Sequence, residues 1–148
     1  MSSQAQFLRA ELREQLLPLV EPEYAAKIQH LVPSQWSALG VRVPKLRGLA
    51  AEMKKRHPRV STADLIVLVD LTFIRHCRED VLCALFWLAS SIKREPAAPL
   101  WAAIDGWIKQ IADWEICDQL AMNVAAPIVA ENPRRVAGRK ARRRRHED

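Results

Sequence analysis

Turn-forming and disulfide-forming residues are scarce in this sequence, which has 4 glycines, 1 tyrosine and 3 cysteines among its 148 residues. A turn-rich β architecture would be expected to use more glycine. The cysteines at 77, 83 and 117 form no CxxC pair, a pattern typical of reduced cytosolic thiols rather than of disulfides or a zinc site. We expect Cys83 and Cys117 to be small apolar residues of the core.

Long apolar runs are lacking as well. No run reaches the roughly 18 residues of a membrane span, and the N-terminal stretch MSSQAQFLRAELREQ has no apolar segment of the kind found in signal peptides. These absences favour a cytoplasmic protein that does not contact membranes, and we expect it to be a monomer. The length suits one domain with a real core.

The net charge is +6, and the excess lies at the C-terminus. Residues 134–148 carry eight basic and two acidic side chains, whereas the preceding 133 residues carry 15 of each. The positive charge therefore does not show by itself that the folded body binds nucleic acid. Within the body, residues 42–59 hold seven basic residues and one acid, Glu52. This stretch is either a phosphate-facing surface or a solvated helix face.

Apolar residues recur at helical spacing through most of the chain, beside residues that favour helix. We expect Phe7 in the apolar stripe of the first helix, Gly40 in a turn, and Ser61 or Thr62 as a helix cap. The run LIVLVDLTFI (65–74) has the β-branched content of a strand, but the cap and its neighbours favour helix. Helices are predicted at about residues 3–17, 23–32, 44–56, 62–74, 77–92, 97–111 and 113–130.

Helices joined by short links that contain proline are typical of repeat proteins, and a unit of roughly 40–47 residues matches the HEAT or armadillo period. We predict an all-α fold in which antiparallel helix pairs stack as HEAT-like repeats, an α-solenoid. A compact helical bundle is the competing architecture. Residues 1–135 form a single domain in this interpretation. Residues 136–148 form a basic tail that we expect to be disordered, because its like charges repel.

Three segments of the sequence carry a family resemblance. They are LVPSQWSALGVRVPKLRGLAAEMKKRHP (31–58), CREDVLCALFWLA (77–89) and LWAAIDGWIKQIADWEICDQLAMNVAAPIVAENP (100–133). In order and spacing they resemble the DNA alkylation-repair family, the AlkD-type DNA glycosylases built from HEAT-like repeats. The resemblance covers about residues 24–135, and its most specific pieces are LGVRVPKLR and the W-x-x-C-D motif.

This resemblance implies a site and a substrate. The family has a Trp and an Asp four residues apart on a helix that lines a concave groove, and these positions correspond to Trp114 and Asp118 as catalytic residues. Its GVRVP segment (40–44) faces the DNA backbone. The implied substrate is double-stranded DNA with purines alkylated at N3 or N7, lesions that carry positive charge. The implied DNA-binding residues are Arg42, Val43, Lys45 and Arg47.

Elementary chemistry agrees with these roles. Breaking a nucleoside bond builds positive charge on the sugar, and an ionised carboxylate such as that of Asp118 stabilises that charge. The face of an indole such as that of Trp114 attracts a cationic base through its quadrupole. Because a cationic base leaves readily, neither a strong general acid nor a metal or organic cofactor is required.

Other interpretations are open for the same residues. Trp114 could pack in the core, Asp118 could be an ordinary solvent-facing acid, and the same spacing recurs in WAAID (101–105) outside the aligned positions. Trp107 and Asp113 are expected to serve packing and helix capping. A non-catalytic helical-repeat scaffold that binds nucleic acid or protein would have the same helix pattern.

The C-terminal sequence departs from the family pattern. Family members continue with further repeats after the helix that ends at the NP dipeptide (132–133), whereas here the chain reads RRVAGRKARRRRHED. We therefore expect a C-terminally truncated relative, in which the arginine run could act as a DNA clamp.

Overall fold

The computed structural model describes residues 3–32, 34–92, 97–111, 113–131 and 134. The all-α prediction is confirmed for this part of the chain, where no helix is long and apolar enough to cross a membrane. The tail predicted for residues 136–148, and its disorder, lie outside the described residues. The elements are α1 (Ser3–Leu16), the 3₁₀ turn η1 (Leu17–Leu19), α2 (Pro22–Leu31), α3 (Val43–Arg56), α4 (Thr62–Ile74), α5 (Arg78–Ala89), α6 (Ala97–Ile108), α7 (Trp114–Gln119), the π-helix η3 (Leu120–Ala125) and α8 (Ala126–Glu131).

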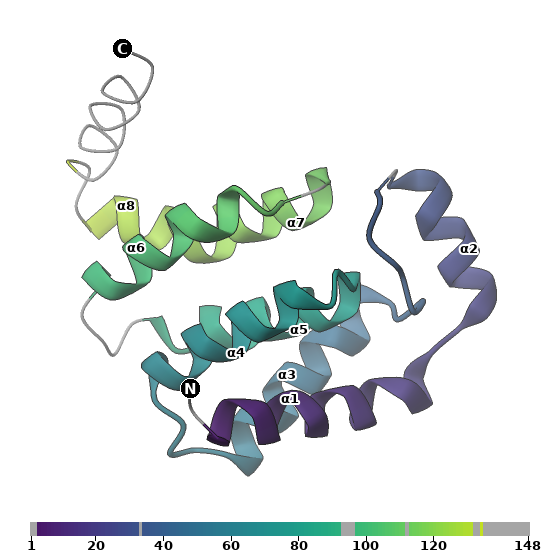
Figure 1. Ribbon diagram of the computed structural model, residues 1–148, viewed down its shortest axis with the longest axis horizontal. Helices are drawn as coiled ribbons and strands as arrows, with labels where there is room; N and C mark the ends of the chain where they lie inside the picture. Colours follow the sequence, from purple (N-terminus) through teal and green to yellow (C-terminus); the bar gives the residue numbers. More distant parts are fainter. Residues whose placement is uncertain (1–2, 33, 93–96, 112, 132–133, 135–148) are drawn as a thin grey trace.

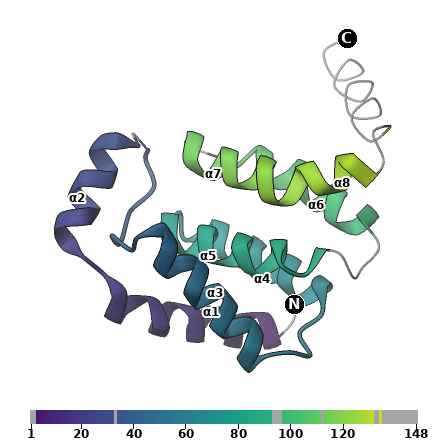
Figure 2. The same ribbon diagram turned by 180° about the vertical axis from the view of Figure 1, so that it is seen from behind.

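The helices stack in layers, with α2 beside one end of the stack (Figure 1). α1 packs on α4 and α4 on α6, while α3 packs on α5 and α5 on α7 and η3. The view from behind brings α3, α5 and the α7–η3–α8 rod to the front (Figure 2). The helices therefore form two columns, which is the arrangement expected of stacked helix pairs.

The middle layer supplies most of the core. Every residue of α5 from Arg78 to Leu88 is buried, which explains why this helix is apolar on all sides after its first three residues. The run 65–74 is helical, as predicted. Its cap is Ser61, whose hydroxyl accepts a hydrogen bond from the Asp64 N–H at 3.1 Å. The apolar side chains of α4 pack against α1, α5 and α6, so tertiary packing outweighs their β propensity.

Two expectations about single residues are wrong. Phe7 is 64% exposed, because the buried stripe of α1 runs through Leu8, Leu12 and Leu16 at a strict spacing of four. Cys117 is exposed as well, since Ile116 occupies the inward face of α7 at that level. Cys83 is buried, as expected.

The packing and capping roles predicted for Trp107 and Asp113 are confirmed. Trp107 is buried, and its indole N–H donates to Asp70 at 2.6 Å, which joins α6 to α4. Asp113 caps α7, since its carboxylate accepts a hydrogen bond from the Ile116 N–H at 3.0 Å.

The connector between α2 and α3 turns at Gly40, as predicted. Gly40 has a φ of +90°, and a Cβ there would lie 2.3 Å from the Glu21 carbonyl oxygen and 2.7 Å from the Ala25 nitrogen. The Gly40 carbonyl accepts a hydrogen bond from the Glu21 N–H at 2.8 Å. The start of α2 therefore packs directly on the backbone of this turn, and only glycine leaves room for it.

We expect Gly40→Ala to lower the free energy of unfolding by about 1–3 kcal/mol from backbone strain alone, with the collision against Glu21 adding to the loss. Gly48→Ala is the matched control, because Gly48 lies inside α3 and a Cβ there meets nothing within 4 Å. That change should stabilise the protein by about 0.5–1 kcal/mol. Urea denaturation measures both values, and a loss of similar size in both variants would contradict this explanation.

Candidate functional site

The residues that α7 directs outward are set by those it buries. Ile116, Leu120, Val124 and Ile128 recur every four residues and are all buried. Positions two residues away lie on the other side of the rod, so Trp114 is 55% exposed and Asp118 is exposed, one turn further along. Trp114 is therefore not a core residue, and an indole and a carboxylate share one accessible helix face.

A cavity of about 590 Å³ lies beyond this pair, between α3, α5 and the π-helix η3. Met122 and Asn123 of η3 form one wall, and Arg47 and Lys54 of α3 stand opposite with Phe86 of α5. Met122 is 71% exposed and follows Asp118 by four residues. The cavity thus opens one turn further along the face that carries Trp114 and Asp118, which are not among its lining residues. Short π-helices of this kind occur frequently at functional sites.

The basic residues expected to contact DNA lie around the start of α3. Arg42, Lys45 and Arg47 are exposed, and Val43 is half-buried. Arg42 and Lys45 both pair with Glu21, at 3.2 and 3.5 Å. These ion pairs are exposed and weak, so a phosphate group could replace Glu21 as their partner at small cost.

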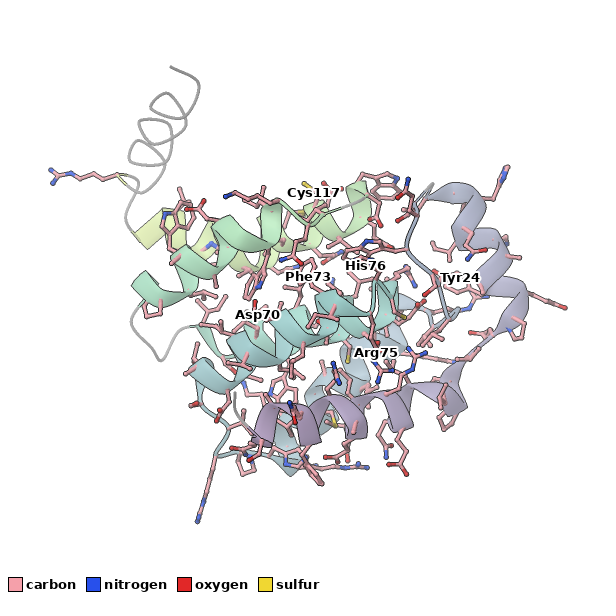
Figure 3. The ribbon with its side chains drawn as sticks, viewed as in Figure 1. Tyr24, Asp70, Phe73, Arg75, His76 and Cys117 are labelled. Atoms are coloured by element: carbon pink, nitrogen blue, oxygen red, sulfur yellow. The ribbon has the colours of Figure 1, made fainter. Side chains whose placement is uncertain are left out.

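Two of these arginines also stack on aromatic rings. The Arg42 guanidinium lies 4.6 Å from the ring centroid of Tyr24 on α2, and that of Arg47 lies 4.5 Å from the ring of Phe86. Figure 3 shows Tyr24 on α2 at one end of the layers. The rings hold the two guanidinium groups in place at the surface without removing their charge.

A buried ionic cluster lies beneath the candidate site, and the sequence analysis missed it. The Arg78 side chain, 5% exposed, binds the Glu115 carboxylate through Nε and Nη2, the latter at 2.9 Å. Its Nη1 donates to Glu79 at 2.6 Å and to the Val41 carbonyl at 3.0 Å. Burial opposes the charge on Arg78, but these carboxylates outweigh it and raise the pKa of the guanidinium above its usual value.

Glu79 completes the cluster. Its carboxylate accepts hydrogen bonds from the backbone N–H groups of Leu39, Gly40 and Val41 at 2.7, 3.1 and 3.2 Å. The first two residues of α5 therefore hold the connector that leads into Arg42, and Arg78 also holds the residue that follows Trp114. The sequence contains one sign of this cluster, namely the charged residues 78–80 at the start of an otherwise apolar helix. Acidic residues at that position are ordinarily interpreted as a complement to the helix dipole.

A second contact fixes the connector to the end of α4, which carries Phe73, and to the turn after it, which carries His76 (Figure 3). Trp36 stacks on His76 with ring centroids 5.5 Å apart and meets the Phe73 ring edge-on. The Ser37 N–H donates to the His76 carbonyl at 2.9 Å, and the Arg78 N–H donates to the Ser37 carbonyl at 3.0 Å. His76 is therefore exposed but engaged in packing, with a left-handed φ of 51°.

In the described part of the chain, no three His, Cys, Asp or Glu side chains are grouped so as to hold a metal ion.

Comparisons with known proteins give one result. No curated protein and no solved structure gives a significant match. A family model described as "DNA alkylation repair enzyme" matches residues 12–142, a span that includes the start of α3, the buried cluster and α7. Because this match extends over most of its length, the chain belongs to the family of DNA alkylation repair enzymes.

Proposed function

We propose that this chain binds alkylated double-stranded DNA and hydrolyses the N-glycosidic bond of purines alkylated at N3 or N7. Family membership supplies the DNA repair role. The observation that carries the specific activity is the pair Trp114 and Asp118, exposed one turn apart on a helix face whose other side is anchored in the core.

The proposed reaction requires little from the protein other than electrostatic stabilisation of its transition state. An N3- or N7-alkylated purine is cationic and leaves as a neutral base, while positive charge develops on the sugar. The Asp118 carboxylate stabilises that charge and orients the attacking water. Trp114 presents its indole face to the cationic lesion. Neither group needs a deep pocket, which agrees with their position on an open helix face.

The basic start of α3 supplies contacts to the DNA backbone in this proposal. Arg42 is the N-cap residue of α3, Lys45 and Arg47 lie in its first turns, and Lys54 follows Arg47 along the wall of the cavity. Residues 47 and 54 are about 10 Å apart along the helix axis. Arg47 and Lys54 share the side of α3 that lines the cavity, whereas Arg42 and Lys45 lie beside Glu21 at the start of the helix. The two groups offer separate contacts to a phosphate backbone beside the exposed face of α7.

We expect Arg47→Ala to weaken binding to duplex DNA and to reduce the slope of log K against log salt concentration by about 0.9, the loss of one phosphate contact. Lys109→Ala is the matched control, because Lys109 is an exposed cation that follows α6, in the other column. Fluorescence anisotropy at several salt concentrations measures both slopes. Equal slopes for the two variants would remove Arg47 from the interface.

The activity itself is tested by a base-release assay on duplex DNA that contains N7-methylguanine. The proposal expects the purified chain to release the base faster than spontaneous depurination. Binding without release would reject the glycosylase activity and favour a helical scaffold that recognises DNA without chemistry.

A further inference from the structure

We infer that Arg78 and Glu115 are positioning residues that hold the helix of Trp114 and Asp118 in register with the DNA-contacting start of α3. The effect on base release rests on the proposed function. The mechanical link itself is a property of the fold and can be tested separately.

The bond between Arg78 and Glu115 fixes an orientation as well as a distance. Two parallel N–H groups of the guanidinium meet the two carboxylate oxygens, a fork geometry that restrains rotation. Glu115 lies directly after Trp114 and three residues before Asp118. α7 has only six residues before the π-helix begins, so this bond and the packing of Ile116 anchor the segment that carries the pair.

The same guanidinium reaches the other half of the site. Its Nη1 holds the Val41 carbonyl at 3.0 Å, and Glu79 holds the three amides of residues 39–41. Arg42 and Lys45 follow immediately. One buried side chain therefore contacts both the segment that leads into the backbone-contacting residues and the helix that carries the proposed catalytic pair.

The Tyr24 ring connects a surface arginine to this buried cluster. Its ring centroid lies 4.6 Å from the exposed Arg42 guanidinium and 5.8 Å from the buried Arg78 guanidinium. Figure 3 shows the tyrosine on α2, close to the connector. The Tyr24 ring thus lies between Arg42, which is expected to contact a phosphate, and Arg78, which orients α7.

A purely structural role would not require this arrangement. Apolar side chains of similar volume commonly fill such a position with equal or greater stability than a buried ion pair. They would not supply the directional bonds that join the 39–41 segment to α7. Displacement of a reacting group by about 1 Å can slow a reaction by 10²-fold. Loss of the directional bond between Arg78 and Glu115 should therefore change the rate of base release measurably.

The test compares two isosteric variants of the cluster. Glu115→Gln keeps the shape but sets an amide N–H₂ against an Arg78 donor, which weakens the fork. We expect the single-turnover rate of base release at saturating protein to fall by about 10²-fold, with the Kd for undamaged duplex changed less than about twofold. Glu79→Gln loosens residues 39–41 and should raise the Kd by a larger factor than it lowers the rate.

Asp80→Asn is the matched control. Asp80 is the next residue of α5, is buried and pairs with Arg13 of α1 at 3.2 Å. Burial raises the pKa of Asp80 despite the opposing charge of Arg13. The Arg13 side chain is 29% exposed, so water can solvate its charge when residue 80 is neutral. This variant should release the base and bind DNA as the unaltered chain does. A rate loss in Asp80→Asn equal to that in Glu115→Gln would assign the effect to general loosening of α5 and overturn the inference.

Amide hydrogen exchange in the free protein gives a readout that does not depend on activity. Glu115→Gln should speed exchange in residues 114–118 and not in 39–41, Glu79→Gln should do the reverse, and Arg78→Lys should affect both. Absence of release by the unaltered chain would reject the proposed function, and the exchange pattern would still decide whether the link exists. Exchange that rises in neither segment of Arg78→Lys, or everywhere in the molecule, would overturn the link itself.

Discussion

Replacement of Asp118 by asparagine is expected to cut the release of a cationic alkylpurine by about 10²-fold or more, with binding to undamaged duplex almost unchanged. This is the scale for loss of one preorganised electrostatic group and corresponds to about 2.7 kcal/mol in the barrier. The reason is that an amide cannot supply the full negative charge that opposes the positive sugar of the transition state. Single-turnover release of N7-methylguanine, with protein in excess over DNA, measures the effect.

Asp105→Asn serves as the matched control for this experiment. Trp101 and Asp105 repeat the spacing of Trp114 and Asp118 on α6, which belongs to the column of α1 and α4. A catalytic role that depends on position rather than spacing predicts unchanged release in this variant. Trp114→Ala should cost less than Asp118→Asn, since a cation–π contact contributes only about 0.5–2 kcal/mol. Release by Asp118→Asn at the rate of the unaltered chain would remove this carboxylate from the mechanism.

The second large effect is expected on stability. Arg78→Met should lower the free energy of unfolding by about 3–5 kcal/mol, because it leaves the carboxylates of Glu79 and Glu115 buried without their common cation. Urea denaturation measures the loss. Arg56→Met is the control, since Arg56 pairs with Glu11 and Glu52 at the surface, with 42% of its side chain exposed. Exposed pairs of this kind contribute at most about 1 kcal/mol.

A double replacement separates stability from positioning. Arg78→Met combined with Glu115→Leu removes both charges of the fork, and we expect it to recover a large part of the stability lost in Arg78→Met. The directional link to α7 is still absent, so base release should remain slow. Recovery of both stability and rate would show that the fork serves only to neutralise buried charge. If the double variant is no more stable than Arg78→Met, the stability lost in Arg78→Met does not come from the unpaired carboxylate of Glu115.

Much of the fold followed from local sequence patterns. The Ser61 cap and the apolar run after it predicted α4 correctly, although β-branched residues fill that run. Gly40 was expected in a turn and has the positive φ that glycine tolerates. The four-residue recurrence of Ile116, Leu120, Val124 and Ile128 is sufficient to turn Trp114 and Asp118 outward. The family membership, too, rests on short motifs that remain visible without coordinates.

The residues that the sequence predicts for the candidate site all lie at its surface. The roles of Trp114, Asp118 and the Arg42–Arg47 segment came from motif resemblance, and they stay predictions until the assays above are done. Their mutual arrangement depends on side chains that no motif singled out. Glu115 lies inside the W-x-x-C-D motif itself as one of its unspecified positions, yet it is the residue of α7 that binds Arg78.

The sequence by itself determined where the helices begin, which residues cap them and, apart from the sides of Phe7 and Cys117, which face turns inward, because these properties depend on neighbours within one or two turns. Only the tertiary structure decided that Phe7 and Cys117 are exposed and that Arg78, Glu79 and Glu115 are buried together. Arg78 and Glu115 are 37 residues apart in the chain. A charged residue at the start of a helix has the same local pattern whether water or another helix covers it, so its burial is set by the stacking of layers that local spacing does not encode.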